Sequence, residues 1–330
     1  MKRSRAPLAL LLVLALAVVA CGGDSSSADG SSSDTAAADG SSATADGPVT
    51  IEHRYGSTTV DETPQRIVSL NPQWTDVMVA MDGPMVAAGL DPAVDGGRYP
   101  WQTGIPESVE DIPVANAIPY EAVAALQPDL ILISFYADTQ AVYDTLSAIA
   151  PTVPLLGQAG VDRWEDMATV AGEVLGEPEK ADELIAEAQQ RTADLRAELP
   201  GLEGETFALA NYVPGDAIYV VADPEDGAST FFADLGLELD PELPALENGD
   251  EGRAQLSLEQ IDLLDADVLI MLTNGTDTAD IPGYDALPAV RSGAVSLLDV
   301  ADVTGLNTPS PLSIPYALER IRPALEAAAR

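Results

Sequence analysis

The sequence predicts an α/β fold, and three observations lead to that prediction. Beyond Val49, short apolar runs typical of strands alternate with amphipathic segments of helical period. The 330 residues are enough for about two domains or lobes with a substantial core. A helix end, an aspartate and an aliphatic strand follow one another at 125–134 and again at 263–273, as in two similarly built lobes, although this order is common in α/β proteins.

Strands are expected where aliphatic runs are bounded by turn-forming residues. Asn71-Pro72 ends the first such run, Gly83-Pro84 precedes the second, and Pro128-Asp129 precedes the third. The strands expected from these signals are 66–70, 85–90, 130–134, 152–156 and 206–210, and the helices between them are 75–81, 121–126 and 141–149.

The middle of the chain is its most helical part. Asp162 is a candidate N-cap for a helix whose apolar residues recur at 3.6-residue spacing up to Gly176. Pro178 then begins a second helix that runs to Leu199. Because no Gly- or Ser-rich linker separates the two halves here, we expect a rigid connection that allows only a small opening.

Charge and composition exclude several classes of function. The chain has 54 acidic and 15 basic residues, a formal charge of −39, so nucleic acid and anionic membrane surfaces are not expected as ligands. A single cysteine excludes a disulfide framework and thiolate clusters, and a single histidine excludes a site of several imidazoles. An anionic ligand must therefore be bound by few, carefully placed cations.

The first 48 residues are expected to direct export of the protein and to tether it to the membrane. A basic start and the 13-residue apolar run 8–20 are typical of a signal peptide, and the run is too short to span a bilayer. Cys21, the only cysteine, follows small residues as in a bacterial lipoprotein processing site, and its acylation would anchor the chain. Residues 22–47 hold no aliphatic side chain larger than alanine and predict a flexible tether. Removal of residues 1–20 would leave 12 basic residues and a formal charge of −42.

Catalytic motifs are not found in the sequence. With 54 acids, a pair of carboxylates carries no information about acid–base chemistry. A Ser/His/Asp triad would need His53, and the chain has no Gly-x-Ser-x-Gly segment. It also has no Gly-x-Gly-x-x-Gly or Walker-type loop, so a dinucleotide or nucleotide site is not indicated. We therefore expect a binding protein that is not an enzyme and carries no cofactor.

Scarce aromatic and cationic residues indicate a ligand site instead. Several of them follow expected strands or lie in turn-rich segments, and ligands of α/β sheets bind beyond the carboxyl ends of strands. Each could alternatively pack on its own lobe or pair with a nearby acid. Aromatic rings with one or two guanidinium groups suit a large anionic or conjugated ligand. The candidates are Trp74, Arg98, Tyr99, Trp101, Phe135, Tyr136, Tyr212 and Arg253.

From about His53 to Pro323 the chain resembles the substrate-binding lipoproteins of ATP-driven (ABC) importers for ferric siderophores, a group with cobalamin- and haem-binding relatives. Each matching segment is weak alone, but their order and spacing are specific. These segments are 53–60, 63–70, 120–131, 149–153, 232–237, 256–260 and 289–295.

The resemblance implies a bilobal periplasmic-binding-protein fold, in which two sheet-and-helix lobes are joined by one rigid bridging helix. The implied division is a signal peptide at 1–20, a lipidated cysteine and tether at 21–48, an N-terminal lobe at 49–161, the bridging helix at 162–177 and a C-terminal lobe at 178–330. Ligand would lie in a shallow cleft between the lobes. A basic residue that some relatives have before the helix at Tyr120 is missing, since this loop reads Val114-Ala115-Asn116-Ala117, so a pocket of three arginines is not expected.

The resemblance also implies what the protein does and with what it works. We expect a monomeric, lipid-anchored extracytoplasmic protein that captures a ferric siderophore, with the iron held by the chelator and no metal bound by side chains. Haem or cobalamin is the alternative ligand, and a non-transport sensor on the same fold is the alternative role. Relatives dock to the membrane permease through one acid on each lobe, for which Asp144 and Asp234 are the candidates.

Overall fold

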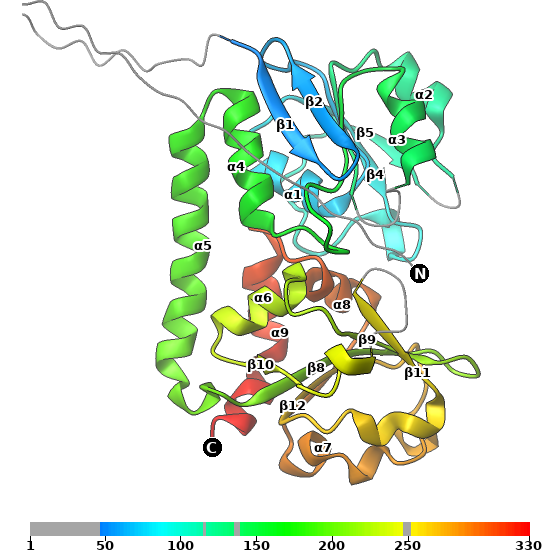
Figure 1. The fold of residues 1–330 in the computed structure, drawn as a ribbon, viewed down its shortest axis with the longest axis vertical. Coiled ribbons are helices and arrows are strands. Elements are labelled where there is room, and N and C mark those ends of the chain that lie inside the picture. Colours follow the sequence, from blue (N-terminus) through cyan, green and yellow to red (C-terminus); the bar gives the residue numbers. More distant parts are fainter. Residues whose placement is uncertain (1–46, 115–116, 135–138, 247–251) are drawn as a thin grey trace, which may run out of the picture. The chain divides into compact units, whose positions relative to one another are not determined.

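A computed structural model describes residues 47–114, 117–134, 139–246 and 252–330. Two sheets divide the described part into an N-terminal and a C-terminal lobe (Figure 1). The expected signal peptide, Cys21 and all but the last two residues of the expected tether lie outside the described residues. Within them, no helix is both long enough and apolar enough to cross a membrane.

The N-terminal lobe is built on a parallel sheet of order β5-β4-β3-β6-β7. An antiparallel hairpin, β1–β2, precedes it in the chain. The strands are β1 (Val49–His53), β2 (Gly56–Val60), β3 (Ile67–Ser69), β4 (Met85–Leu90), β5 (Glu110–Pro113), β6 (Leu130–Leu132) and β7 (Thr152–Val153). The helices are α1 (Pro72–Ala80), α2 (Tyr120–Ala125) and α3 (Gln140–Ser147). Every strand and helix expected in this half is present, although several differ in their bounds.

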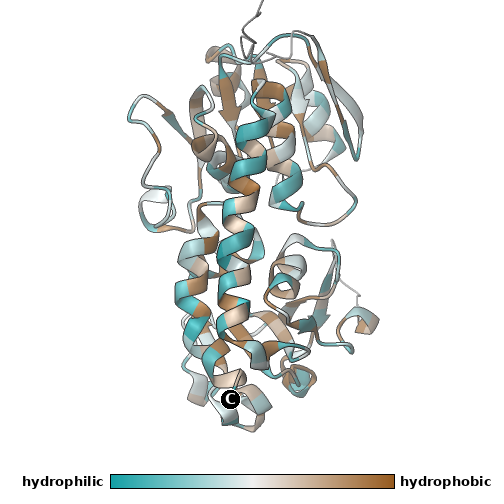
Figure 2. Ribbon diagram, turned by 90° about the vertical axis from the view of Figure 1, so that its left-hand side faces the viewer, coloured by the Kyte–Doolittle hydropathy of each residue, from teal (hydrophilic) through white to brown (hydrophobic). Residues whose placement is uncertain are grey.

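The bridging helix is not the segment expected from the sequence. Helix α4 (Trp164–Leu175) has 12 residues, about 18 Å, and buries its apolar face against the N-terminal lobe. Helix α5 (Pro178–Glu198) has 21 residues, about 32 Å, and contacts α4 as well as α6 of the C-terminal lobe. Figure 1 shows α5 running along both lobes, and in Figure 2 much of the face that it turns to the viewer is hydrophilic. The connection between the lobes is therefore α5, within the range assigned to the second lobe.

Asp162 does not cap α4 as expected. The N-cap is Arg163, with no side-chain hydrogen bond, because the Asp162 carboxylate accepts instead from the backbone N–H groups of Leu156 (2.8 Å) and Gly157 (3.1 Å). It thereby stabilises the loop that leads to the helix.

The C-terminal lobe contains a mixed sheet of order β11-β9-β8-β12-β13, with β10 also paired to β8. Strands β12 and β13 are parallel to β8, whereas β9 is antiparallel to it. The strands are β8 (Thr206–Tyr212), β9 (Ile218–Val221), β10 (Glu238–Leu239), β11 (Arg253–Leu256), β12 (Val268–Leu272) and β13 (Val295–Leu298). The helices are α6 (Gly227–Asp234), α7 (Pro288–Ser292), α8 (Val300–Asn307) and α9 (Ser313–Ala328). Short 3-10 helices occur at Asp95–Gly97, Pro200–Leu202, Pro244–Leu246, Leu258–Leu263, Thr278–Asp280 and Tyr284–Ala286.

The repeated pattern in the sequence corresponds to one structural device in each lobe. Asp129 precedes β6 and accepts backbone N–H bonds from Gln65 (2.7 Å) and Arg66 (2.8 Å), at the start of neighbouring β3. Asp267 precedes β12 and accepts from the N–H and hydroxyl of Thr206, both at 2.8 Å, at the start of neighbouring β8. Each aspartate thus secures the start of the strand beside its own.

The lobes share buried structure. One hydrophobic cluster includes Trp74 of the first lobe and Phe207 of the second. The buried amide of Gln73 donates to the carbonyls of Asp162 (3.2 Å) and Pro309 (2.6 Å). At the start of α6, a Cβ on Gly227 would lie only 2.7 Å from the Asp162 carbonyl oxygen. Such close packing opposes a wide relative movement of the lobes.

Candidate functional site

The segment after β4 carries three of the predicted ligand residues. Tyr99 and Trp101 stack with ring centroids 4.8 Å apart and an interplanar angle of 16°. Tyr99 is buried, and its hydroxyl donates to Asp91. The Arg98 guanidinium pairs with the Asp111 carboxylate, which is half exposed. This segment is therefore ordered by its own contacts, and Trp101 is the more exposed of its two aromatic residues.

Trp101 also contacts the C-terminal lobe. Its ring packs against Tyr316 of α9, with centroids 5.3 Å apart. It approaches Gly305 of α8 so closely that a Cβ there would lie 2.9 Å from Cη2 of the indole. Glycine is needed at this position for the ring to fit against the helix.

Asp76 of α1 accepts hydrogen bonds from both sides of this contact. Its Oδ2 accepts from the Trp101 indole N–H (2.7 Å) and the Ser310 hydroxyl (2.5 Å), and its Oδ1 accepts from the Gln102 amide (2.7 Å). Burial raises the pKa of Asp76 from its ordinary value of 3.8 to about 6, although the three hydrogen bonds oppose the shift. A buried carboxylate therefore connects the Trp101 segment with the other lobe.

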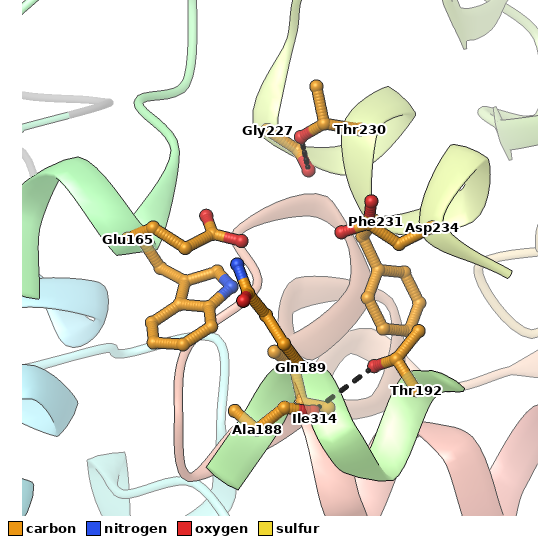
Figure 3. Close-up of a pocket in the computed structure, with 10 residues that line it drawn as sticks. Glu165, Ala188, Gln189, Thr192, Gly227, Thr230, Phe231, Asp234 and Ile314 are labelled. Carbon is orange, nitrogen blue, oxygen red and sulfur yellow. Dashed lines mark hydrogen bonds between the residues drawn. The ribbon is translucent and has the colours of Figure 1, made fainter. Parts of the chain in front are cut away.

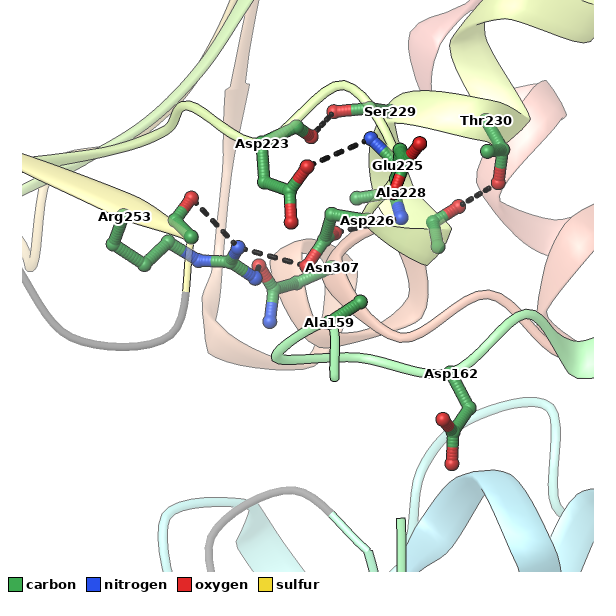
Figure 4. Close-up of polar contacts among 12 residues, drawn as sticks. Ala159, Asp162, Asp223, Glu225, Asp226, Ala228, Ser229, Thr230, Arg253 and Asn307 are labelled. Carbon is green, nitrogen blue, oxygen red and sulfur yellow. Dashed lines mark hydrogen bonds and ion pairs between the residues drawn. The ribbon is translucent and has the colours of Figure 1, made fainter. Parts of the chain in front are cut away.

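Arg253, at the start of β11, lies in a second polar cluster (Figure 4). Its Nη1 donates to Asp226 Oδ2 and its Nη2 to Asn307 Oδ1, both at 2.9 Å. The Asp226 side chain is 0% exposed and that of Arg253 is 14% exposed. Burial raises the pKa of the Asp226 carboxyl, and the charge of Arg253 counteracts that rise. The pairing with a nearby acid, the alternative left open by the sequence, is therefore what the structure contains.

The last turn of α8 brings these two clusters together. Gly305 on this turn contacts Trp101, and Asn307, two residues later, accepts from Arg253. A loop of the first lobe and a strand of the second thus place an aromatic ring and a guanidinium on the same helix turn. We take this region as the candidate ligand site.

Two predicted residues lie in the core instead. Trp74 is 0% exposed and belongs to α1, and its indole N–H donates to the carbonyl of Ile133 (3.1 Å). The Asn71-Pro72 pair, expected to end the first strand ahead of a helix at 75, itself starts the helix: Asn71 is the N-cap and Pro72 the first helical residue. Tyr212 does end β8, but its ring is buried in the C-terminal core. The structure does not support direct ligand contact by either side chain.

The remaining predicted residues are separate from this region or not described. Phe135 and Tyr136 lie outside the described residues. Asp144 is exposed on α3, where it accepts from Gln140 (2.7 Å). Asp234, at the end of α6, is exposed as a residue. The surrounding protein nevertheless removes part of the water around its carboxyl group, which raises its pKa.

Asp234 borders a solvent-open recess between α4, α5, α6 and α9 (Figure 3). Trp164, Phe231 and Ile314 supply apolar surface there. Glu165 also lines the recess, and burial raises its pKa, with a smaller contribution from the charge of Asp234. No residue predicted to bind ligand lines this recess, so we do not assign it as the ligand site.

Metal ligation is not indicated in the described ranges, where no group of three or more His, Cys, Asp or Glu side chains is placed to hold an ion. His53 Nε2 lies 3.0 Å from the Thr58 hydroxyl, and the ring lies against Tyr143 with centroids 5.0 Å apart. The histidine therefore has a structural role in the β1–β2 hairpin.

Sequence reasoning missed the acids that organise the site. Asp76 lies between Thr75 and Val77 in a helix whose residues 73–78 are buried, a signal that was lost among 54 acids. Asp226 caps α6 by accepting from the N–H of Ala228 (2.9 Å), a position typical of aspartate. No pattern in the sequence distinguished Asn307 or Ser310.

Comparison with known proteins gives consistent matches. A family model described as periplasmic binding protein matches residues 67–300. The probable siderophore-binding lipoprotein YfiY of Bacillus subtilis is 29% identical over 70% of this chain and 70% of its own. The ferric enterobactin-binding periplasmic protein FepB of Escherichia coli is 30% identical over 64% of this chain and 68% of its own. The crystal structure of Streptococcus pneumoniae PiaA in complex with ferrichrome aligns with a TM-score of 0.73 at 24% identity, over 85% of this chain and 98% of PiaA.

Proposed function

The chain belongs to the periplasmic binding protein family, and on this premise we propose that it is an extracytoplasmic lipoprotein that captures a ferric siderophore for an ABC importer. The observation that carries the proposal is the match to relatives named for siderophore or ferric enterobactin binding, over about two thirds of the chain. The fold supports it as well, because a structural neighbour was crystallised with ferrichrome.

The proposed contact residues are those that meet around the last turn of α8. Trp101 would offer apolar surface to the ligand, and Arg253 would face its anionic oxygens. Arg98 would contribute a second cation, because its partner Asp111 is half exposed and the pair can separate at little cost. Tyr99 would support the indole of Trp101. Phe135 and Tyr136 are proposed as further ligand contacts on the basis of the sequence alone.

Capture would need no chemistry by the protein. The chelator would hold the iron, and the site would discriminate by charge and shape. In a chain with a formal charge of −39, most of the surface repels an anionic chelate, so binding would depend on the few local arginines. The buried contacts between the lobes would limit closure to a small movement, with ligand favouring the closed arrangement.

Anchoring and delivery complete the proposal. Acylation of Cys21 would hold the protein at the membrane, and residues 22–47 would act as a flexible tether between this anchor and the folded body. Asp144 on α3 and Asp234 on α6 would meet cationic side chains of the permease. A monomer suffices for each of these steps.

Calorimetric titration tests the ligand class. The chain carrying Cys21→Ser would be titrated with a ferric catecholate, ferrichrome, ferric citrate, haem and cobalamin, with each iron-free chelator as the blank. We expect at least one ferric chelate to bind with micromolar or tighter affinity. Binding of haem or cobalamin alone would establish the alternative ligand, and no binding tighter than the high-micromolar range would refute a capture role.

Matched variants test the site. Trp101→Leu and Arg253→Lys should each weaken the bound chelate by roughly tenfold or more, whereas Arg291→Met, which removes an exposed arginine on α7, should not. Lysine at position 253 keeps a cation beside Asp226, so the fold is preserved while the planar guanidinium is lost. Unchanged affinity in both site variants would place the ligand elsewhere.

A further inference from the structure

Asp76 is unusual among the acids of this chain because its partners are neutral and come from both lobes. The indole of Trp101, the amide of Gln102 and the hydroxyl of Ser310 all donate to it, and the residue is 1% exposed. Ionising a carboxylate in such surroundings costs free energy that an asparagine would not cost. A costly group at a contact between lobes suggests a role beyond packing.

The donor set matches the ionised form of Asp76 and not the protonated form. An indole N–H has no lone pair to accept a proton donated by a carboxylic acid. The Gln102 amide could accept only by turning over, which would break the bond that its Oε1 accepts from the Tyr99 N–H (3.2 Å). Ser310 Oγ could accept, but it already accepts from the Ser313 N–H (2.9 Å) while donating to Asp76. None of the three partners can therefore accept the added proton unless its present bond is broken or reversed.

We propose that the ionised carboxylate of Asp76 positions the Trp101–Gln102 segment against the C-terminal lobe, and that protonation of Asp76 loosens this connection. Because Trp101 belongs to the proposed ligand site, its consequence for binding rests on the proposed function. Burial sets the pKa of Asp76 at about 6, which places the transition within an accessible pH range.

Other titratable groups near this contact are either bonded to their own partners or exposed to solvent. On the Trp101 side, Arg98 pairs with Asp111 and the Tyr99 hydroxyl donates to Asp91. On α9, Tyr316 and Arg320 both bond Asp302 of α8, which is preceded by the α8 cap Asp299. On α4, Asp166 and Glu173 are exposed and Glu165 faces the recess shared with Asp234. Asp162 accepts from backbone N–H groups, and α1, β3, β4 and residues 308–313 contain no other ionisable side chain.

The indole N–H resonance of Trp101 reports on the contact directly and without ligand. In ¹H–¹⁵N spectra of the Cys21→Ser chain, the peak missing from Trp101→Phe identifies it among three tryptophans. We expect this peak to titrate with a midpoint near pH 6, to be independent of pH between 5 and 8 in Asp76→Asn, and to titrate unchanged in Glu107→Gln, an exposed acid nearby. Gln102→Met and Ser310→Ala each remove a donor to the charged form and should raise the midpoint, a test that remains if Asp76→Asn fails to fold.

Ferrichrome binding at pH 7.5 and 5.5 extends the test to function. If ferrichrome binds, lowering the pH from 7.5 to 5.5 should reduce its affinity for the wild-type chain about tenfold more than its affinity for Asp76→Asn. A tenfold difference is what the loss of one hydrogen bond to a charged group would cause. A titrating indole with equal pH dependence of binding in both chains would overturn the effect on ligand while supporting the positioning role. A wild-type indole peak that does not move between pH 5 and 8 would overturn the proposal whatever the binding result. If ferrichrome does not bind at either pH, the indole result alone decides the positioning role, and the titrations with the other ferric chelates decide the proposed function.

Discussion

Removal of the Arg253 guanidinium should destabilise the fold strongly, because it leaves a buried carboxylate without its cation. In Arg253→Met, Asp226 keeps its cap bond to α6 but loses the donor 2.9 Å from its Oδ2. Breaking a buried ion pair by removing one partner costs about 3–5 kcal/mol in the free energy of unfolding. At about 2–4 °C per kcal/mol for a domain of this order of size, the melting temperature should fall by roughly 6–20 °C.

The same reasoning predicts how this loss depends on pH. Arg253 holds the pKa of Asp226 below the value that burial alone would give, so its removal raises that pKa further. Below the raised pKa the carboxyl is neutral and the penalty is reduced, whereas above it the full cost of a buried charge applies. Arg253→Met should therefore lose more stability relative to wild type at pH 8 than at pH 5.

Urea denaturation at both pH values, combined with a double-mutant cycle, measures these effects. Asp226→Asn removes the charge but keeps a side-chain oxygen for the cap, and the double variant should lose less than the sum of the single losses, by about 1–3 kcal/mol. Arg291→Met, the exposed control, should change stability by less than about 0.5 kcal/mol. A loss in Arg253→Met no larger than that of this control, or losses in the cycle that simply add, would refute a structural ion pair at this position.

Three further predictions concern stability and packing. The folded chain keeps the Asp76 proton up to about pH 6 while the unfolded chain loses it near 3.8, so ionisation of Asp76 should lower the free energy of unfolding by up to about 3 kcal/mol as pH rises through this window, and Asp76→Asn should remove this contribution in urea titrations. Gly305→Ala places a Cβ 2.9 Å from the Trp101 ring, so overpacking of about 1–3 kcal/mol should outweigh a gain of about 1 kcal/mol in helix propensity and displace the indole, seen as red-shifted emission. Asp129→Ala and Asp267→Ala each remove two hydrogen bonds from a strand start and should cost similar amounts, about 1–2 kcal/mol each, in urea denaturation.

Exposed acids serve as controls for these predictions. Glu107→Gln should keep the wild-type pH dependence of stability, and Asp144→Ala should cost less than about 0.5 kcal/mol. An unchanged emission maximum in Gly305→Ala would show that the indole does not lie against α8. Markedly unequal losses in the two aspartate variants would contradict their equivalent roles.

Residues close together in the sequence were the ones from which structure could be predicted. Aliphatic runs bounded by Gly, Pro and Asp predicted the strands β3, β4, β6, β7, β8 and β12, because strand formation there depends on local pattern and burial. The repeated Asp–strand pattern even predicted two similarly built halves. The family resemblance, based on the order of several weak segments, is confirmed by the match over residues 67–300.

The roles of individual residues depended on contacts between distant segments. Asn71-Pro72 is compatible with either a loop or a helix start, and tertiary packing placed Trp74 in the core. Local sequence patterns predicted both α4 and α5 as helices, but only their packing showed that α5 contacts both lobes.

The sequence by itself thus determined the α/β class, the family and the scarcity of cations that makes each arginine informative. Only the tertiary structure decided which of the 54 acids are buried, because burial arises from residues more than two hundred positions apart, such as Asp76 and Ser310. Tertiary packing also joined Arg253 to Asp226 and brought it to the helix turn that contacts Trp101.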